Sequence, residues 1–309
     1  MIGWNTRVGL CLPTERREAL GVLYRRAPES LRARLVEDAL AQTEAGEVDL
    51  SGLWVARRHG GQVVGAILTQ ALAGHAAALW APEVDAILGR RSTALALVRA
   101  ALDDLRARGF QLAQALLDES SPAQAADDLE AGGMPHVTDL VYLEADTQTL
   151  LPVRPELPPI DWLPFEPETE AEFRQVLQET YIDSLDMPEL EGMRSLDDVL
   201  ASHKASGRFV SERWRMGRVR GIPEAGAVLL LSEIPDRDAW EIAYLGINPA
   251  GRGRGLGRAV LAHALETARP YAARIELAVD IRNLPAYNLY RSAGLRAFDR
   301  RAVHIAMLG

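Results

Sequence analysis

The chain has 309 residues, of which 48% are hydrophobic and 25% charged, and its formal net charge is −9. These proportions are typical of a soluble globular protein, and the negative charge argues against a protein that binds nucleic acid. The single cysteine, Cys11, excludes an intramolecular disulfide and a cysteine-based zinc site. No histidine spacing typical of a metal site occurs, so we expect no metal. No apolar run is long enough for a membrane span and no signal-peptide pattern follows Met1, so we expect a cytoplasmic protein.

A chain of this length favours two domains. In the first half, hydrophobic periodicity and turn residues predict alternating strands and helices. In order, these are a strand at 7–12, helices at 14–26 and 28–42, strands at 53–56, 63–68 and 76–80, a helix at 93–108, a strand at 110–117, a helix at 122–131 and a strand at 136–144.

Residues 146–167 are rich in proline, which indicates a stiff linker. We therefore predict a first domain at 1–146, a linker at 147–159 and a second domain at 160–309. The predicted elements of the second half are a strand at 160–165, helices at 169–181 and 195–203, strands at 209–219, 227–233 and 240–247, a helix at 256–268, a strand at 275–281, a helix at 284–293 and a strand at 302–308. The two halves thus repeat one α/β unit at an offset of about 160 residues.

A glycine- and arginine-rich segment, residues 248–258, lies where a strand gives way to a helix. We call it the Gly/Arg loop. The first turn of a helix exposes unpaired N–H groups, and glycines let a ligand approach them. The segment therefore predicts a site for a phosphate or pyrophosphate group, although a solvated glycine-rich turn remains the alternative. The dinucleotide pattern fails because Arg258 stands where a third glycine is needed, and no P-loop sequence occurs.

Within this loop, Arg252-x-x-Gly255-x-Gly257 resembles the acetyl-CoA pyrophosphate loop of the GCN5-related N-acetyltransferase (GNAT) family. A second segment, from Asn283 through Tyr290 to Gly294, is similar to the family's other signature and follows at the expected distance. The resemblance covers residues 160–309 by motif and 1–146 by element order. It implies an α/β (α+β) fold of tandem GNAT-like domains, each a mixed, mainly antiparallel sheet flanked by helices.

The resemblance also implies how acetyl-CoA would be held. In the family, the fourth and fifth strands splay apart and the pantetheine arm lies between them. Leu245 and Ile247 would supply backbone hydrogen bonds to that arm, and Asn283 would lie near it. The pyrophosphate would lie on residues 252–258. The residues expected there are Arg252, Gly253, Arg254, Gly255, Gly257 and Arg258.

The same resemblance suggests catalytic residues. An ammonium group must lose its proton before it can attack a thioester, and a carboxylate acting through water can accept that proton. We expect Glu241, on the strand that enters the loop, in this role, with a solvent-facing strand residue as an equal alternative. Tyr290 would protonate the leaving thiolate. Three acids, Asp183, Asp186 and Glu189, could attract a cationic acceptor, although such a run is more often a solvated loop.

The first half lacks the corresponding glycines, because Arg90, Arg91 and Ser92 stand in that position, and Leu129 stands about where Tyr290 stands. We therefore expect a degenerate N-terminal unit, with weak anion binding by its arginines left open. The sequence predicts an enzyme that transfers acetyl from acetyl-CoA to an unidentified amine. The alternatives are a non-enzymatic acyl-CoA-binding or regulatory protein, and acetylation of a cysteinyl amine on a small thiol.

Overall fold

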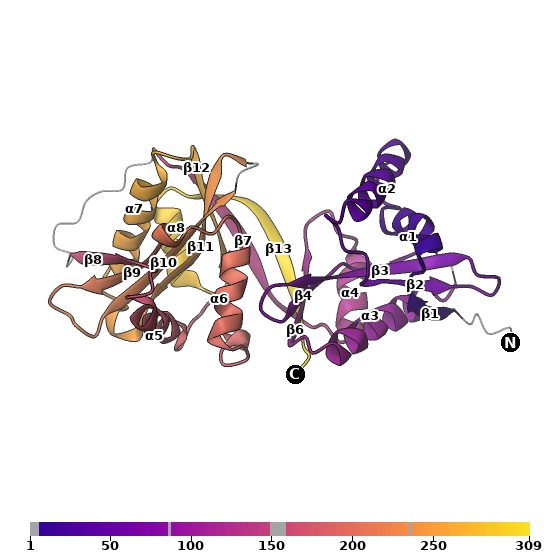
Figure 1. Ribbon diagram of the computed structural model, residues 1–309, viewed down its shortest axis with the longest axis horizontal. Coiled ribbons are helices and arrows are strands. Elements are labelled where there is room, and N and C mark those ends of the chain that lie inside the picture. The colour runs from indigo at the N-terminus through magenta and orange to yellow at the C-terminus, as the bar shows by residue number, and fades with distance from the viewer. Residues whose placement is uncertain (1–5, 86–87, 149–158, 235–236) are drawn as a thin grey trace. The chain divides into compact units, whose positions relative to one another are not determined.

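The computed structural model describes residues 6–85, 88–148, 159–234 and 237–309, and it confirms the predicted α/β fold (Figure 1). The chain forms two compact units. The N-terminal unit comprises Met1–Val137 and Ala302–Gly309, and the C-terminal unit comprises Thr138–Arg301.

The two halves of the chain present their elements in the same order, which confirms the predicted repeat. The first series is β1 (Arg7–Leu10), α1 (Arg16–Leu23), α2 (Glu29–Glu44), β2 (Leu53–Arg57), β3 (Val63–Leu72), β4 (Ala76–Leu79), the short β5 (Glu83–Val84), α3 (Arg90–Ala107), β6 (Leu112–Leu117), α4 (Ala123–Gly132) and β7 (His136–Asp146). The second series is β8 (Ile160–Pro164), α5 (Glu170–Tyr181), α6 (Leu196–Ala205), β9 (Trp214–Val219), β10 (Gly226–Ile234), β11 (Ala239–Ile247), α7 (Leu256–Ala268), β12 (Arg274–Asp280), α8 (Leu284–Ser292) and β13 (Arg296–Met307).

Sheet pairing confirms the mixed, mainly antiparallel architecture. In the N-terminal unit the strand order is β1-β2-β3-β4-β6-β13, with β5 beside β3. In the C-terminal unit it is β7-β12-β11-β10-β9-β8. The parallel pairs with described registers are β4 with β6 and β11 with β12.

The compact units differ from the predicted domain boundaries at two strands. β7, expected at the end of the first domain, pairs with β12 from Leu140 to Asp146. The last part of β13, expected in the second domain, pairs with β6 from Ala302 to Met307. An alternating pattern predicts a strand and its buried face, but it does not tell which sheet edge the strand joins. The predicted linker at 147–159 lies mostly outside the described residues.

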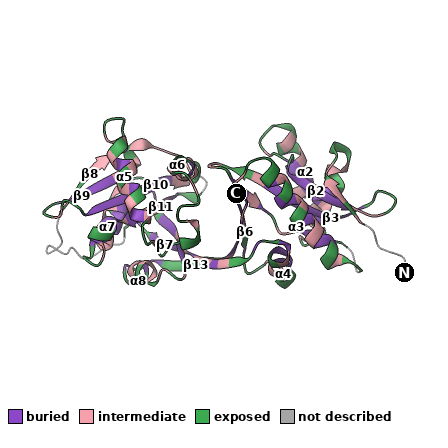
Figure 2. Cartoon of the chain, turned by 90° about the horizontal axis from the view of Figure 1, so that it is seen from below, coloured by how far each residue is buried: buried purple, intermediate pink, exposed green. Residues whose placement is uncertain are grey.

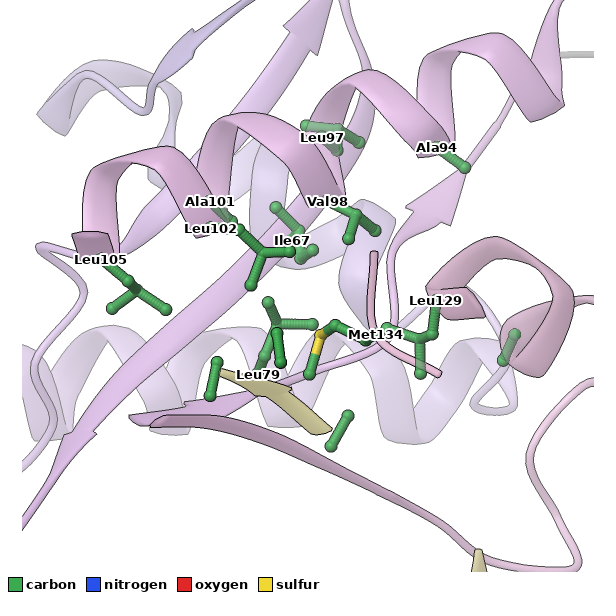
Figure 3. Close-up of a cluster of buried hydrophobic side chains, with 14 of the residues drawn as sticks. Ile67, Leu79, Ala94, Leu97, Val98, Ala101, Leu102, Leu105, Leu129 and Met134 are labelled. Carbon is green, nitrogen blue, oxygen red and sulfur yellow. The ribbon is translucent and has the colours of Figure 1, made fainter. Parts of the chain in front are cut away.

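Each unit builds its core on both faces of its sheet (Figure 2). In the C-terminal unit, α5 and α6 pack on one face, against Trp214, Val228 and Leu230. α7 and α8 pack on the other face, against the alternate β10 residues Leu229 and Leu231. In the N-terminal unit, buried residues of α3 and α4 meet the sheet in one cluster (Figure 3). β10, which is buried from Gly226 to Ser232, therefore forms the middle layer that supports the site.

Several predicted element ends shift in the structure. The helix expected from residue 169 begins at Glu170, because Thr169 donates its hydroxyl to the Pro164 carbonyl (2.5 Å) and makes no side-chain cap. β13 begins at Arg296, six residues before the predicted start. Its charged first half lies beside β7, where Arg300 pairs with Asp139. Because several of these residues are charged, the hydrophobic pattern did not predict a strand there.

Because the last part of β13 belongs to the N-terminal unit, we expect a core substitution there to destabilise that unit. Ile305 lies near the C-terminus but is buried in the N-terminal unit, with 3% of its surface exposed. Ile305→Ala should destabilise that unit by about 3 kcal/mol, because a buried isoleucine loses its packing. Scanning calorimetry should show a lower Tm, and limited proteolysis should first cut within residues 6–137. Arg296→Ala, at the exposed start of the same strand, should leave both readouts unchanged; first cuts within 159–301 would contradict the assignment.

Candidate active site

Two parallel strands of the C-terminal unit separate after a short paired stretch. β11 and β12 pair only from Ala239 to Glu241, against Arg274 to Glu276. On its other side, β11 pairs with β10 up to Ile247, with a bulge at Ala243 where the register shifts. β11 and β12 thus diverge, and a cavity of about 600 Å³ opens where pairing stops.

This cavity contains most of the residues that the sequence singled out. Its lining includes β11 residues 242–247, the Gly/Arg loop, the end of β12 and the face of α8. The predicted residues among them are Leu245, Ile247, Arg252, Gly253, Gly255, Gly257, Asn283 and Tyr290. Three predicted residues, Arg254, Arg258 and Glu241, are not part of the lining.

The β11 edge that faces the cavity has backbone groups available for hydrogen bonding. Asn248 donates its backbone N–H to the Gly226 carbonyl (3.0 Å) on the β10 side. Because successive residues of a strand direct their N–H and C=O groups to opposite edges, Ile247 and Leu245 direct theirs toward the cavity. This edge can accept an extended ligand in the manner of an added strand.

The Gly/Arg loop forms the start of α7 in a conformation that suits glycine. Gly253 (φ 74°) and Gly255 (φ 78°, the residue before α7) are both left-handed. Successive N–H groups in such a turn converge, and the start of the helix adds positive potential. A Cβ on Gly257 would lie 3.0 Å from Leu289, so this glycine also lets α7 approach α8. The loop therefore has the features of an anion site.

The arginines of the loop have different tasks. Arg252 donates to three backbone carbonyls, those of Ile247 (3.0 Å), Thr180 (3.0 Å) and Asp183 (3.2 Å). Its side chain therefore joins the loop to β11 and to the end of α5. Arg254 is exposed and donates to the Ala250 carbonyl. Arg258 has a buried Nε without a hydrogen-bond partner among the described residues.

Asn248 fixes the start of the loop, a role that the sequence did not indicate. Its side-chain oxygen accepts the N–H groups of Gly226 (2.9 Å) and Gly251 (3.3 Å), and its amide donates to Glu179 and to the Glu224 carbonyl. A buried asparagine inside the segment was the available signal, because a buried amide needs several partners.

α8 directs its tyrosine into the cavity. Asn283 caps this helix, since its side chain accepts the Ala286 N–H (3.2 Å). Tyr290 is 6% exposed and lines the cavity. Burial raises the pKa of Tyr290, and the charge of nearby Asp186 adds to the effect. The hydroxyl therefore stays protonated across the physiological range.

Glu241 lies in the paired part of β11, opposite Glu276 of β12. Burial raises the pKa of Glu241 to about 6, and the charge of Glu276 contributes. Its proton affinity suits a general base. Because Glu241 does not line the cavity, a chain of water molecules would have to connect it to an amine there.

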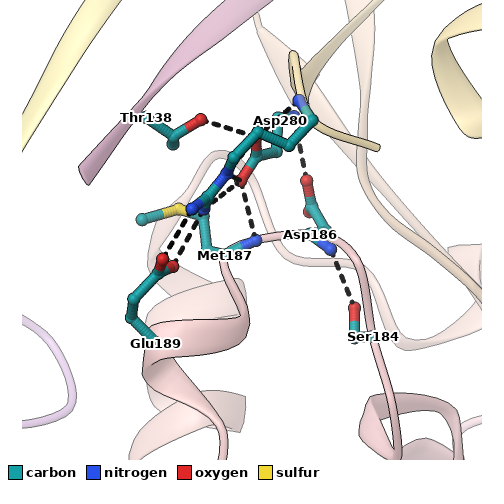
Figure 4. A network of polar contacts seen from close by, with 7 residues as sticks. Thr138, Ser184, Asp186, Met187, Glu189 and Asp280 are labelled. Carbon is teal, nitrogen blue, oxygen red and sulfur yellow. Dashed lines mark hydrogen bonds and ion pairs between the residues drawn. The ribbon is translucent and has the colours of Figure 1, made fainter. Parts of the chain in front are cut away.

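Residues 183–191, which we call the acidic loop, are held by a network of polar contacts (Figure 4). The Asp280 carboxylate accepts hydrogen bonds from the Thr138 hydroxyl (2.6 Å), the Met187 N–H (3.1 Å) and the Arg282 guanidinium (2.7 Å). Arg282 also binds Glu189, so Glu189 is paired and does not face an acceptor. Burial alone would raise the pKa of Asp280, but the hydrogen bonds from Arg282 and Thr138 outweigh it and hold that pKa below its ordinary value.

A second cavity of about 420 Å³ lies next to the first, between the acidic loop, α5, α6 and β11. The two cavities share Ser184, Asp186, Ala243 and Tyr244. Of the three predicted acceptor-attracting acids, Asp183 lines the first cavity and Asp186 lines both. The sequence did not indicate this second cavity, because its walls come from segments up to 66 residues apart.

The corresponding place in the N-terminal unit is filled by side chains. Arg90, at the start of α3, binds the carboxylate of Asp128 on α4 (2.6 and 2.7 Å), and Asp128 is 1% exposed. Leu129 is fully buried in the apolar cluster shown in Figure 3. The anion-binding role left open for Arg90 is therefore replaced by an internal ion pair.

In the described ranges, no helix is both long and apolar enough to cross a membrane. The same ranges contain no group of three or more histidine, cysteine, aspartate or glutamate side chains that could hold a metal ion.

Comparison with known proteins gives a family match in this half of the chain. Residues 173–295 match the model of the acetyltransferase (GNAT) family. The chain is 36% identical to the mycothiol acetyltransferase of Kineococcus radiotolerans over 118 residues, which cover 34% of this chain and 37% of that protein. It is 41% identical to the mycothiol acetyltransferase of Beutenbergia cavernae over 73 residues, 23% of this chain and 24% of that protein. The matched segments thus span 37% and 24% of the lengths of these two relatives.

A solved structure resembles the whole chain. The GCN5-related N-acetyltransferase from Sphaerobacter thermophilus superposes with a TM-score of 0.57 at 18% identity, covering 98% of this chain and 96% of that one. At this identity the likeness shows the fold alone.

The network around Asp280 predicts how firmly the acidic loop is held. Asp280→Asn should increase hydrogen exchange about 30-fold in residues 183–191, because a hydrogen bond to a charged group is worth about 2 kcal/mol. Asp161→Asn, which removes an exposed ion pair with Arg220, should leave that exchange unchanged. Since the folded pKa of Asp280 is depressed, the protection should persist above about pH 4 and disappear only as the pH falls through that lower pKa. Equal exchange in both variants would contradict this role.

Proposed function

We propose that this chain, whose residues 173–295 belong to the GNAT acetyltransferase family, is an N-acetyltransferase that transfers acetyl from acetyl-CoA to an amine. One observation supports this most strongly. The cavity between the diverging strands β11 and β12 is lined at one end by the glycines of the Gly/Arg loop, at the start of α7, and has the buried Tyr290 in its wall.

The residues around this cavity fit the parts of acetyl-CoA. The left-handed glycines Gly253 and Gly255 and the first turn of α7 would hold the pyrophosphate, and Arg254 and Arg258 would add positive charge. Arg252 would act mainly by shaping the loop, since its guanidinium already binds three carbonyls. Bound there, acetyl-CoA supplies an activated thioester.

The remaining predicted residues would align the acyl group. Leu245 and Ile247 would hydrogen-bond the pantetheine arm through their backbone groups, and Asn283 lines the same cavity. Tyr290 would donate a proton to the sulfur as it leaves, which its raised pKa permits at neutral pH. A backbone N–H near the β11 bulge would stabilise the developing oxyanion.

The acceptor has one specific alternative. Both curated relatives are named mycothiol acetyltransferases, which supports the cysteinyl amine of a small thiol as a candidate. A second class, a non-enzymatic acyl-CoA-binding or regulatory protein, would keep the same cavity but release no thiol with any amine. A cytoplasmic location and the absence of nucleic-acid partners stay predictions.

Two variants test the acetyl-CoA site. Gly255→Ala should weaken CoA binding about tenfold, because alanine resists φ near 78° and adds a methyl group at the loop. Arg252→Ala should also weaken binding, because the loop loses three hydrogen bonds. Isothermal calorimetry with CoA measures both. Gly221→Ala is the matched control, since Gly221 has φ 80° and open space around it. Unaltered affinity in both loop variants would refute the assignment.

A further variant tests the proton donor. Tyr290→Phe should lower turnover about 100-fold, the usual effect of losing a general acid, while CoA affinity stays within about twofold. Tyr287→Phe on the same helix is the control and should keep full activity. Thiol release from acetyl-CoA measures turnover, and unchanged release in Tyr290→Phe would exclude this role.

A further inference from the structure

We propose that the 420 Å³ cavity binds the acceptor, a small monoamine with a mainly apolar body, and that Asp186 holds its ammonium group and accepts its proton. This inference rests on the proposed function, because it assumes that acetyl-CoA occupies the neighbouring 600 Å³ cavity.

The two cavities share one wall, made by four residues. Of the four residues that line both, only Asp186 has a charged side chain. An amine in one cavity and a thioester in the other can meet only at this wall. Glu241 lines neither cavity, so it would need water molecules to reach an amine that Asp186 can contact directly.

Asp186 is held in place by the loop network. Its Oδ1 accepts the backbone N–H of Asp280 (2.9 Å), and its own N–H donates to the Ser184 hydroxyl (3.1 Å). The next residue, Met187, has φ 48°, a left-handed conformation that costs about 1 kcal/mol, and its N–H binds the Asp280 carboxylate. Figure 4 shows Asp186 opposite the end of β12. Fixed backbone contacts leave the second carboxylate oxygen for a ligand.

The surroundings of Asp186 favour a proton acceptor. Asp186 as a whole residue is exposed to the cavities, although protein atoms around its carboxylate still limit the carboxylate's contact with water. The loss of water around the carboxylate is the largest effect and raises the pKa of Asp186, and the negative charge of Asp280 raises it further. The hydrogen bond from the Asp280 N–H and the positive charge of Arg282 lower that pKa, but the net shift is upward. Burial raises the pKa of three nearby tyrosines, and the charge of Asp186 adds to the effect on each, so all three hydroxyls remain neutral: Tyr181, Tyr244 and Tyr290. The carboxylate therefore binds a proton more readily than an ordinary aspartate does.

The wall of the second cavity indicates the class of acceptor. Much of it is apolar, including Ile182, Leu190, Leu196 and Val199. Its histidine, His203, bonds the Tyr181 hydroxyl (2.9 Å), and burial lowers the pKa of His203 to about 4, so the ring is neutral.

Charges in this wall leave one net negative group. Glu191 and Arg194 carry opposite charges, so Asp186 supplies the balance. One ammonium group satisfies that charge. The hydroxyls of an amino sugar or further ammonium groups of a polyamine would lose water against an apolar wall, which is unfavourable.

The proposed step balances as follows. The ammonium group gives one proton to Asp186, which passes it to solvent, and the freed nitrogen lone pair forms the C–N bond to the thioester carbon. The C–S bond breaks and its electrons go to sulfur, which Tyr290 protonates. The nitrogen then gives a second proton to the deprotonated Tyr290, which restores the tyrosine. The products are an amide, a thiol and one released proton.

Acceptor choice is the first test. Thiol release from acetyl-CoA is compared for 2-phenylethylamine, glucosamine and spermidine. We expect kcat/KM to be at least tenfold higher for 2-phenylethylamine. A preference for glucosamine or spermidine would overturn the acceptor class, and so would no release with any of the three while CoA binds. A wild-type protein that does not bind CoA in calorimetry would instead refute the proposed function.

The second test concerns Asp186. Asp186→Asn keeps the size of the side chain and an oxygen for the Asp280 N–H. It should reduce kcat/KM about 100-fold, abolish the acidic limb of its pH profile and leave CoA affinity unchanged. Asp197→Asn, on the exposed surface of α6, is the matched control. If Glu241→Gln abolishes that limb while Asp186→Asn keeps it, the proposal is wrong.

A readout independent of turnover completes the test. In carboxyl-¹³C NMR of aspartate-labelled protein, the signal missing from Asp186→Asn should titrate above about 3.9, the ordinary value, and higher still with CoA bound. Titration at or below that value would overturn the role of Asp186.

Discussion

The site depends on one constraint, the divergence of β11 and β12 after Glu241. While two strands are paired, their backbone groups satisfy each other and no ligand can enter. Beyond Glu241 the bulge at Ala243 changes the course of β11, and the edge that faces the cavity pairs with no strand, although the Ile247 carbonyl accepts from Arg252. The Gly/Arg loop begins where this open edge ends, so the strand and the helix start face one cavity.

The hydrogen bonds of Asp280 determine the position of the acidic loop. Asp280, the last residue of β12, is fully buried and binds Thr138, Arg282 and the Met187 N–H. These contacts hold the acidic loop in a conformation that includes two non-glycine residues with positive φ, Asp183 and Met187. Charge-assisted hydrogen bonds offset the strain of these two residues. The loop conformation places the Asp186 carboxylate where the two cavities meet.

The N-terminal unit shows how the same order of elements can lack such a site. There the position of the Gly/Arg loop is occupied by Arg90, which pairs with a buried Asp128, and Leu129 fills the apolar cluster. An internal ion pair and a packed leucine replace the anion site and the tyrosine. Small changes in side-chain size and charge therefore separate a binding site from a packed core on one architecture.

The sequence by itself determined the features that arise within one element or one turn. The Gly/Arg loop, the order of elements and the repeat were predicted, because hydrophobic periodicity and turn residues are local patterns. The roles of Asn283 and Tyr290 were expected from the family resemblance instead. The tertiary structure alone decided which sheet edge receives β7 and β13, since an alternating strand fits either edge. It also turned Arg252 inward onto carbonyls, paired Glu189 with Arg282 and brought Asp186 between two cavities. Those contacts join residues far apart in the chain, and no local pattern encodes them.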